Sequence, residues 1–125
     1  MENKTILIVD DCKDIRQLVK ATLEFEGCNV IEADSGTKAV QAAQHHKPDL
    51  IILDMIMPGE LNGIETTRRI KSNPQTARCK IIILTGSEWE ARSEVLEAGA
   101  SEFFMKPFSP LNLINKVEEL LEMGV

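Results

Sequence analysis

Two short runs of consecutive apolar residues place the strongest constraint on the fold of this chain. They occupy residues 6–9 (ILIV) and 50–53 (LIIL), and neither run alternates with polar residues. Continuous runs of this length, rich in β-branched side chains, are typical of strands buried on both faces of a parallel sheet. Because successive parallel strands must be joined by crossover segments, helices are expected on both faces of such a sheet.

Strand patterns and helix patterns alternate from one end of the chain to the other. Strands are predicted over residues 5–9, 29–33, 50–53, 80–84 and 102–105. Helices are predicted over residues 13–26, 36–46, 64–72 and 88–98, and from Pro110 onward. In the first helix, the residues expected to face the core are Ile15, Leu18, Val19 and Leu23. Five strands that alternate with five helices in one domain, residues 1–125, indicate a doubly wound α/β sandwich.

Composition limits the classes of function open to the chain. The net charge of −6, without any basic stripe, argues against direct binding of nucleic acid. No apolar stretch approaches the roughly 20 residues that a membrane-spanning helix needs, and the first residues do not resemble a signal peptide. The three cysteines show no C-x-x-C spacing, which argues against a disulfide framework and a zinc site. Together these features indicate a cytoplasmic protein.

Acidic residues follow both of the apolar runs. Asp10 and Asp11 come directly after the first run, and Asp54 comes directly after the second. Because the carboxyl ends of neighbouring parallel strands share one edge of the sheet, the three carboxylates are expected to converge there. Like charges held this close repel each other, and a divalent cation that prefers oxygen ligands relieves the repulsion. The sequence therefore predicts a Mg²⁺ site, and with it phosphate chemistry.

Two further polar residues come directly after predicted strands: Thr85 after the fourth and Lys106 after the fifth. Asp54 could attack a phosphorus atom as a carboxylate nucleophile, and the transferred phosphoryl group would then need a cation and a hydrogen-bond donor nearby. Lys106 and the Thr85 hydroxyl fit these roles. Each of these residues taken alone is an ordinary turn or surface residue, but their shared position at strand ends favours a functional site.

Taken in order, these residues resemble the receiver domain of bacterial-type two-component response regulators, in its single-domain, chemotaxis-regulator-like form. The resemblance spans the whole chain and rests on four motifs: residues 6–11 (ILIVDD), 54–58 (DMIMP), 85–86 (TG) and 106–108 (KPF). It implies a flavodoxin-like, five-stranded parallel sheet in the strand order 2-1-3-4-5, with five helices. It also implies a signalling domain that is not an enzyme beyond its own self-catalysed phosphorylation and dephosphorylation.

The resemblance implies a role for each acid at the predicted sheet edge. Asp54 is implied to be the phosphoacceptor, which takes a phosphoryl group from a sensor histidine kinase or a phosphotransfer protein. Asp10 and Asp11 are implied to form the Mg²⁺ pocket with Asp54, and the main-chain carbonyl of Ile56 is implied to complete it. The domain would then pass its signal to a downstream effector protein or domain.

The resemblance also implies a conformational switch. Thr85 and Lys106 are implied to contact the phosphoryl oxygens. On phosphorylation, Thr85 would move towards the phosphate and Phe103 would turn into the space it leaves. That step would remodel the face made by the fourth helix, the fifth strand and the fifth helix. The plainer reading of Phe103 is core packing, and because Phe103 and Phe104 are adjacent on a strand, they are expected to face opposite sides of the sheet.

Two departures from the family pattern bear on the site. The loop over residues 58–63 is one residue longer than is usual between its proline and its glycine. Ile56 is apolar at a position that the family uses to tune dephosphorylation, and an apolar side chain cannot position an attacking water. Slow self-hydrolysis of the phosphorylated form is therefore expected.

Two other functions share some of these features. A phosphorylation-independent interaction module of the same fold would be expected to have lost the acceptor or the lysine, yet Asp54 and Lys106 are both present. A Mg²⁺-dependent phosphatase with an aspartate nucleophile usually places two aspartates two residues apart on its first strand, whereas Asp10 and Asp11 are adjacent. The sequence leaves open which kinase and effector the domain serves, and whether it acts alone or within a longer regulator.

Overall fold

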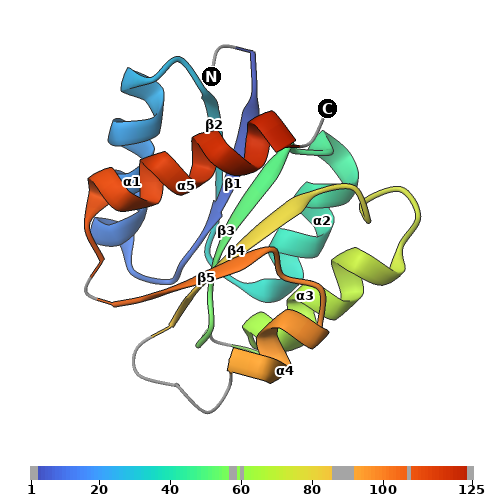
Figure 1. Ribbon diagram of the computed structural model, residues 1–125. Helices are drawn as coiled ribbons and strands as arrows, with labels where there is room; N and C mark the ends of the chain where they lie inside the picture. Colours follow the sequence, from blue (N-terminus) through green and yellow to red (C-terminus); the bar gives the residue numbers. More distant parts are fainter. Residues whose placement is uncertain (1–2, 57–58, 60, 86–91, 107, 124–125) are drawn as a thin grey trace.

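Five parallel strands form one sheet at the centre of the molecule (Figure 1). The structure, a computed structural model, describes residues 3–56, 59, 61–85, 92–106 and 108–123. In chain order the strands are β1 (Thr5–Val9), β2 (Asn29–Ala33), β3 (Leu50–Asp54), β4 (Lys80–Thr85) and β5 (Glu102–Met105). They lie in the order β2-β1-β3-β4-β5, and every pairing is parallel. The predicted flavodoxin-like sheet and its strand order are confirmed.

Helices cover the sheet from both sides. They are α1 (Lys13–Phe25), α2 (Gly36–His46), α3 (Gly63–Ser72), α4 (Arg92–Glu97) and α5 (Pro110–Met123). Helices α1 and α5 lie against one face of the sheet, and α2, α3 and α4 lie against the other (Figure 1). None of the helices in the described part of the chain has the length and apolar character needed to cross a membrane. The doubly wound sandwich predicted from the alternating pattern is therefore present.

Burial on both faces explains the continuous apolar runs of the central strands. In β1, Ile6 and Ile8 pack on the side of α1 and α5, whereas Leu7 and Val9 pack on the side of α2, α3 and α4. All four side chains are at most 1% exposed. The strand can therefore present polar groups to solvent only at its ends.

The edge strand β5 repeats this alternation with partly exposed side chains. Phe103 packs against the core cluster on the side of α2, α3 and α4, and Phe104 packs against the cluster on the side of α1 and α5. The prediction that these two rings face opposite sides of the sheet is confirmed.

The predicted core face of α1 was wrong in one position. Val19 and Leu23 are buried and Ile15 packs against the same cluster, but Leu18 is 49% exposed. Leu18 precedes Val19 by one position, about 100° around the helix, so it lies at the margin of the apolar stripe. There it lines an apolar groove between α1 and α5 that Phe108 also lines. Helical spacing alone overestimated the width of the buried face.

Several boundaries differ slightly from the predictions. Helix α3 begins at Gly63, one residue earlier than predicted. Strands β3 and β4 continue through Asp54 and Thr85, so these residues end their strands instead of following them. The predicted start of the helix over residues 88–98 lies outside the described residues, and its described part is α4, Arg92–Glu97.

Gly63 holds the turn from β3 into α3 close to the end of β3. Its amide donates to the carbonyl oxygen of Met55 (2.8 Å), and Asn62 caps the helix by accepting from the amide of Glu65 (2.9 Å). A Cβ on Gly63 would lie 2.8 Å from the carbonyl oxygen of Asp54 and 2.8 Å from the Cα of Met55. Because both of these atoms belong to the backbone, room for a side chain requires the end of β3 to shift.

Replacing Gly63 with alanine is expected to lower the free energy of unfolding by about 2–3 kcal/mol, because it overpacks the turn against backbone atoms. Urea denaturation measures this change. Gly59→Ala is the control: a Cβ there meets nothing within 4 Å, so only its φ of +89° opposes the substitution, at about 1 kcal/mol. Equal losses in the two variants would show that the turn at Gly63 has room for a methyl group.

Candidate functional site

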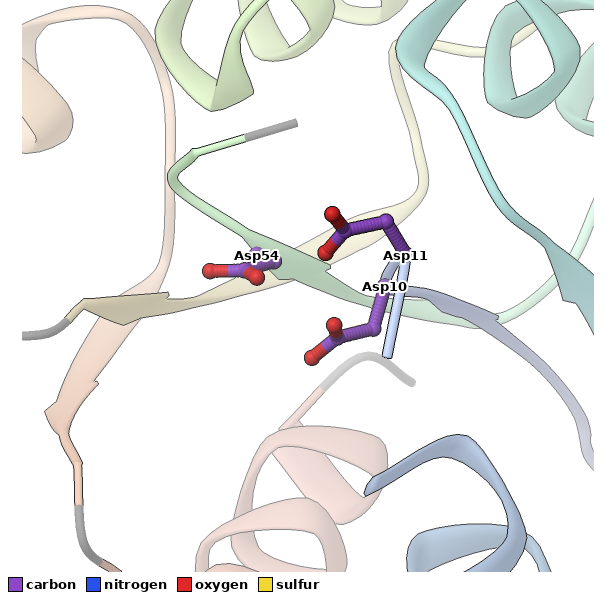
Figure 2. Close-up of side chains that lie close together, drawn as sticks. All are labelled: Asp10, Asp11 and Asp54. Atoms are coloured by element: carbon purple, nitrogen blue, oxygen red, sulfur yellow. The ribbon is translucent and has the colours of Figure 1, made fainter. Parts of the chain in front are cut away.

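Three carboxylates gather at the carboxyl edge of the sheet. Asp10 and Asp11 follow β1, and Asp54 ends the neighbouring strand β3. One oxygen atom from each of the three lies within 4.8 Å of the other two. Figure 2 shows the three side chains grouped around the ends of these strands. The structure thus brings together the acids that were predicted to converge.

The three carboxylates differ in exposure. Asp10 is 1% exposed and Asp54 is 7% exposed, whereas Asp11 lies open to solvent. Burial raises the pKa of Asp10, and the charge of Asp54 adds to the rise, although the amide of Cys12 and the charge of Lys106 act in the opposite direction. The ionised form of Asp10 is therefore destabilised in the folded protein.

Two contacts fix the position of Asp10. The amide of Cys12 donates to Asp10 Oδ1 (2.8 Å), and Arg16 of α1 donates from Nη1 to the main-chain carbonyl oxygen of Asp10 (2.7 Å). Arg16 also donates from Nε to Glu32 on β2 (3.2 Å), which ties α1 to two strands. Sequence reasoning missed Arg16. The sequence offers one signal for Arg16, which is its position in the first helix after the acidic pair. Any residue type can supply a main-chain carbonyl, so the identity of the partner residue gives no further signal.

Lys106 brings a positive charge to the cluster from the end of β5. Its amine lies 3.1 Å from Asp54 Oδ2 and 3.5 Å from Asp10 Oδ2. Its main-chain amide donates to the carbonyl oxygen of Thr85 (2.7 Å), which positions the chain next to β4. Burial acts to lower the pKa of Lys106, but the hydrogen bond to Asp54 and the charges of both carboxylates outweigh it, and the pKa is raised. Lys106 is thus a fixed cation beside Asp54.

Thr85 and Phe103 share one face of the sheet. Thr85 ends β4 and is 2% exposed, and Phe103 of the neighbouring strand β5 is half-buried. Phe103 pairs across the strands with Ile83, two residues before Thr85. Because side chains two residues apart on a strand face the same way, Thr85 and Phe103 are diagonal neighbours.

Ile56 follows Asp54 by two residues and its side chain is 65% exposed. The side chain of Ile56 offers no hydrogen-bonding group at the margin of the acidic cluster. The longer loop of residues 58–63 lies partly outside the described residues, which include 59 and 61–63 but not 58 or 60.

The donor set fits a small, hard divalent cation. All three side chains offer carboxylate oxygen, the ligand that Mg²⁺ takes, and within the described residues no histidine or cysteine joins the cluster. Lys106 balances only part of the negative charge, so a divalent cation would relieve the remaining repulsion. The same edge presents a carboxylate nucleophile, a fixed cation and a threonine hydroxyl, which together suit phosphoryl transfer.

Replacing Asp10 with asparagine is expected to raise the free energy of unfolding by about 1 kcal/mol at pH 7, because it removes a buried charge that Asp54 repels. Asparagine Oδ1 can still accept from the amide of Cys12. Urea denaturation without divalent cations measures the change. Asp34→Asn, at an exposed acid, is the control and should change stability by less than about 0.5 kcal/mol.

The gain in the free energy of unfolding from Asp10→Asn should increase as the pH rises above about 4. Because the pKa of Asp10 is higher in the folded chain than in the unfolded chain, folding favours its protonated form. The contribution of Asp10 to the stability of the wild-type protein therefore falls as pH rises from about 4, the unfolded value, through the raised folded value. Below about pH 4 the advantage of the variant should vanish. A variant less stable than wild type at pH 7 would show that the contact with Lys106 outweighs burial and repulsion.

Comparison with known proteins places the chain in one family. The family model for the response regulator receiver domain matches residues 6–118. The phosphate regulon transcriptional regulatory protein PhoB of Pseudomonas aeruginosa is 40% identical over 122 residues, which cover 97% of this chain and 53% of PhoB. Histidine kinase P4 of Formosa agariphila is 38% identical over 122 residues, which cover 97% of this chain and 9% of that kinase. The solved receiver domain of the Francisella response regulator 1452 aligns with a TM-score of 0.90 at 30% identity, covering 98% of this chain and 100% of that domain.

The structural neighbours agree with the observed fold and strand order. The chain spans about half the length of the curated regulators it matches, among them PhoB. Receiver domains generally bind Mg²⁺ at an acidic aspartate cluster, and such a cluster is present here. The chain belongs to the response regulator receiver domain family, whose members are signalling domains of two-component systems and not classical enzymes.

Proposed function

We propose that this domain accepts a phosphoryl group on Asp54 from a histidine of a sensor kinase or of a phosphotransfer protein. One observation carries the proposal: Asp54 lies in a cluster with Asp10 and Asp11, and its carboxylate oxygen is 3.1 Å from the amine of Lys106. In the transfer, an oxygen of Asp54 bonds to phosphorus as the phosphorus–nitrogen bond to histidine breaks. The products are an aspartyl phosphate on this domain and a free histidine on the donor.

The residues around Asp54 have separate roles in the proposed phosphoryl transfer. The ligands proposed for Mg²⁺ are oxygen atoms of Asp10, Asp11, Asp54 and the main-chain carbonyl of Ile56. When bound, the ion supplies positive charge to the phosphoryl oxygens. Lys106 contacts one phosphoryl oxygen as a fixed cation, and the Thr85 hydroxyl donates a hydrogen bond to another.

The proposed switch couples Thr85 to Phe103. Drawing Thr85 towards the phosphoryl group opens space on the face that it shares with Phe103, and the ring of Phe103 turns inward. The half-buried state of Phe103 supports this step, because the ring is packed on one side without being enclosed. The movement alters the face formed by α4, β5 and α5, where Leu96 is 40% exposed and Met105 is 43% exposed. These exposed apolar side chains support a partner-binding role for that face.

The domain is proposed to act in the cytoplasm. Its proposed partners are a sensor histidine kinase or phosphotransfer protein and a downstream effector protein or domain. The relatives support both, since they include a histidine kinase and a transcriptional regulator about twice the length of this chain. The net charge of −6 supports protein and not nucleic acid as the direct contact of the receiver domain itself.

Incubation with acetyl phosphate is expected to add one phosphoryl group to the protein, as measured by intact mass spectrometry. The gain should require Mg²⁺ and should be lost in Asp54→Asn, because both the nucleophile and the cation pocket are needed. Asp34→Asn, an exposed acid elsewhere, should gain the group as wild type does. If Mg²⁺ binds and no phosphoryl group is added, the domain is instead a phosphorylation-independent interaction module.

The phosphorylated form is expected to decay slowly, and Ile56→Asn should speed its decay several-fold. The amide side chain can hydrogen-bond an attacking water beside Asp54, whereas the isoleucine cannot. The fraction of phosphorylated protein, followed by mass spectrometry after removal of acetyl phosphate, gives the rate. Phe25→Asn is the matched control, since Phe25 is 90% exposed at the far end of α1. Unchanged decay in Ile56→Asn would contradict a role for this position.

A further inference from the structure

A cavity of about 440 Å³ lies at the amino edge of the sheet, opposite the acidic cluster. Three of its walls are the segments that lead into β1, β3 and β4, and the fourth is the carboxyl-terminal part of α5. A volume of this size falls in the range of small-molecule sites in proteins, roughly 300–1,000 Å³. It is far larger than the space that a single inorganic ion needs.

Positively charged side chains dominate the polar part of this cavity. The cations that line it are Lys4, Lys47, Arg78 and Lys80, and the one carboxylate is Asp49. Asp49 already accepts a hydrogen bond from the amide of Thr5 (2.9 Å). Among the described residues, none of the four cations forms a salt bridge, although the chain as a whole carries a net charge of −6. The cavity therefore carries a local excess of positive charge in an acidic protein.

Apart from Gln75, the remainder of the lining is apolar. Leu120 and Leu121 of α5 present their side chains at 8% and 7% exposure, and Pro48 and Cys79 are also buried. Burying an apolar group of a ligand against such a wall is favourable. An inorganic anion would leave this wall unused, whereas an organic anion would use both halves of the cavity.

Hydrogen bonds hold the cavity walls in place. The thiol of Cys79 donates to the carbonyl oxygen of Pro48 (3.0 Å), which joins the segments before β3 and β4. Lys71 of α3 donates from Nζ to the carbonyl oxygens of Ala77 (3.0 Å) and Cys79 (2.5 Å), so the chain on both sides of Arg78 is anchored. Cavities with preformed walls bind ligands without a large ordering cost.

From the cavity, its charge and its apolar wall, we propose that the amino edge of the sheet binds a nucleotide-sized organic phosphate. The phosphate groups lie among Lys47, Arg78 and Lys80, and the ring system packs on Leu120 and Leu121. Because the acidic cluster is at the other edge of the same sheet, this binding leaves access to Asp54 unchanged. The proposal stands apart from the phosphoacceptor function and does not depend on it.

The test is a titration of the ¹⁵N-labelled protein with ADP, without divalent cations, followed by NMR chemical shifts. Expected shifts are centred on residues 47–49, 78–80 and 120–121. In the double variant Lys47→Gln with Arg78→Gln, at two exposed positions, the affinity for ADP should fall at least tenfold. The control double variant, Lys13→Gln with Lys38→Gln, removes the same charge from the starts of α1 and α2 and should bind ADP as wild type does.

Several outcomes would overturn the proposal. These are the absence of ADP binding to the wild-type protein at millimolar concentration, equal weakening in the two double variants, and shifts centred on the acidic cluster. Inorganic phosphate is titrated in parallel. If phosphate binds as tightly as ADP, the apolar wall contributes nothing to binding and the proposal of an organic ligand is overturned. Thermal unfolding is measured for both double variants. If each variant keeps the unfolding transition of the wild type, a loss of affinity for ADP is due to the changed cavity lining and not to loss of the folded structure.

Discussion

The central strands of the sheet bury side chains on both of their faces, and the rest of the molecule depends on this constraint. Ile6 and Leu7 point to opposite cores, so a polar side chain within β1 would have to be desolvated. Polar groups therefore collect where strands end, at the two edges of the sheet. Because β1 lies beside β3, the residues that end these distant segments become neighbours at one edge.

At the carboxyl edge, the protein keeps an arrangement of charges that is unfavourable in the free domain. Asp10 and Asp54 are almost completely buried, and Lys106 is the cation placed directly against them. Burial raises the pKa of Asp10, which means that its negative charge is tolerated and not stabilised. Sites of binding and chemistry often retain such conflicts, because resolving them would remove the affinity for the ligand. The fit to a divalent cation follows from this imbalance.

The two edges of the sheet differ in charge and share one scaffold. The acids lie where β1 and β3 end, and Lys47, Arg78 and Lys80 lie where β3 and β4 begin. Loops at the ends of rigid strands can carry different chemistry without disturbing the core between them. A receiver domain built in this way can hold a phosphoryl site at one edge and a separate anion site at the other.

Short-range patterns were sufficient to predict most of the fold. Continuous apolar runs reveal strands that are buried on both faces, and helical spacing reveals the covering helices, because both signals extend over only a few residues. The resemblance to the receiver family added the strand order. Leu18 shows the limit of such patterns: helical spacing placed it in the core, but it lies at the margin of the apolar stripe of α1 and lines a groove between α1 and α5.

The sequence by itself determined the strands, the helices and the acids at the strand ends, including Asp10 and Asp54. Their convergence could be predicted because parallel strands bring their carboxyl ends to one edge. Only the tertiary structure decided the contact of Arg16 with the Asp10 carbonyl and the cavity at the amino edge. Arg16 binds a main-chain atom that every residue type possesses. The cavity exists because the end of α5 packs over loops from three segments that are far apart in the sequence. Local sequence patterns extend over only a few residues, so they do not encode this packing.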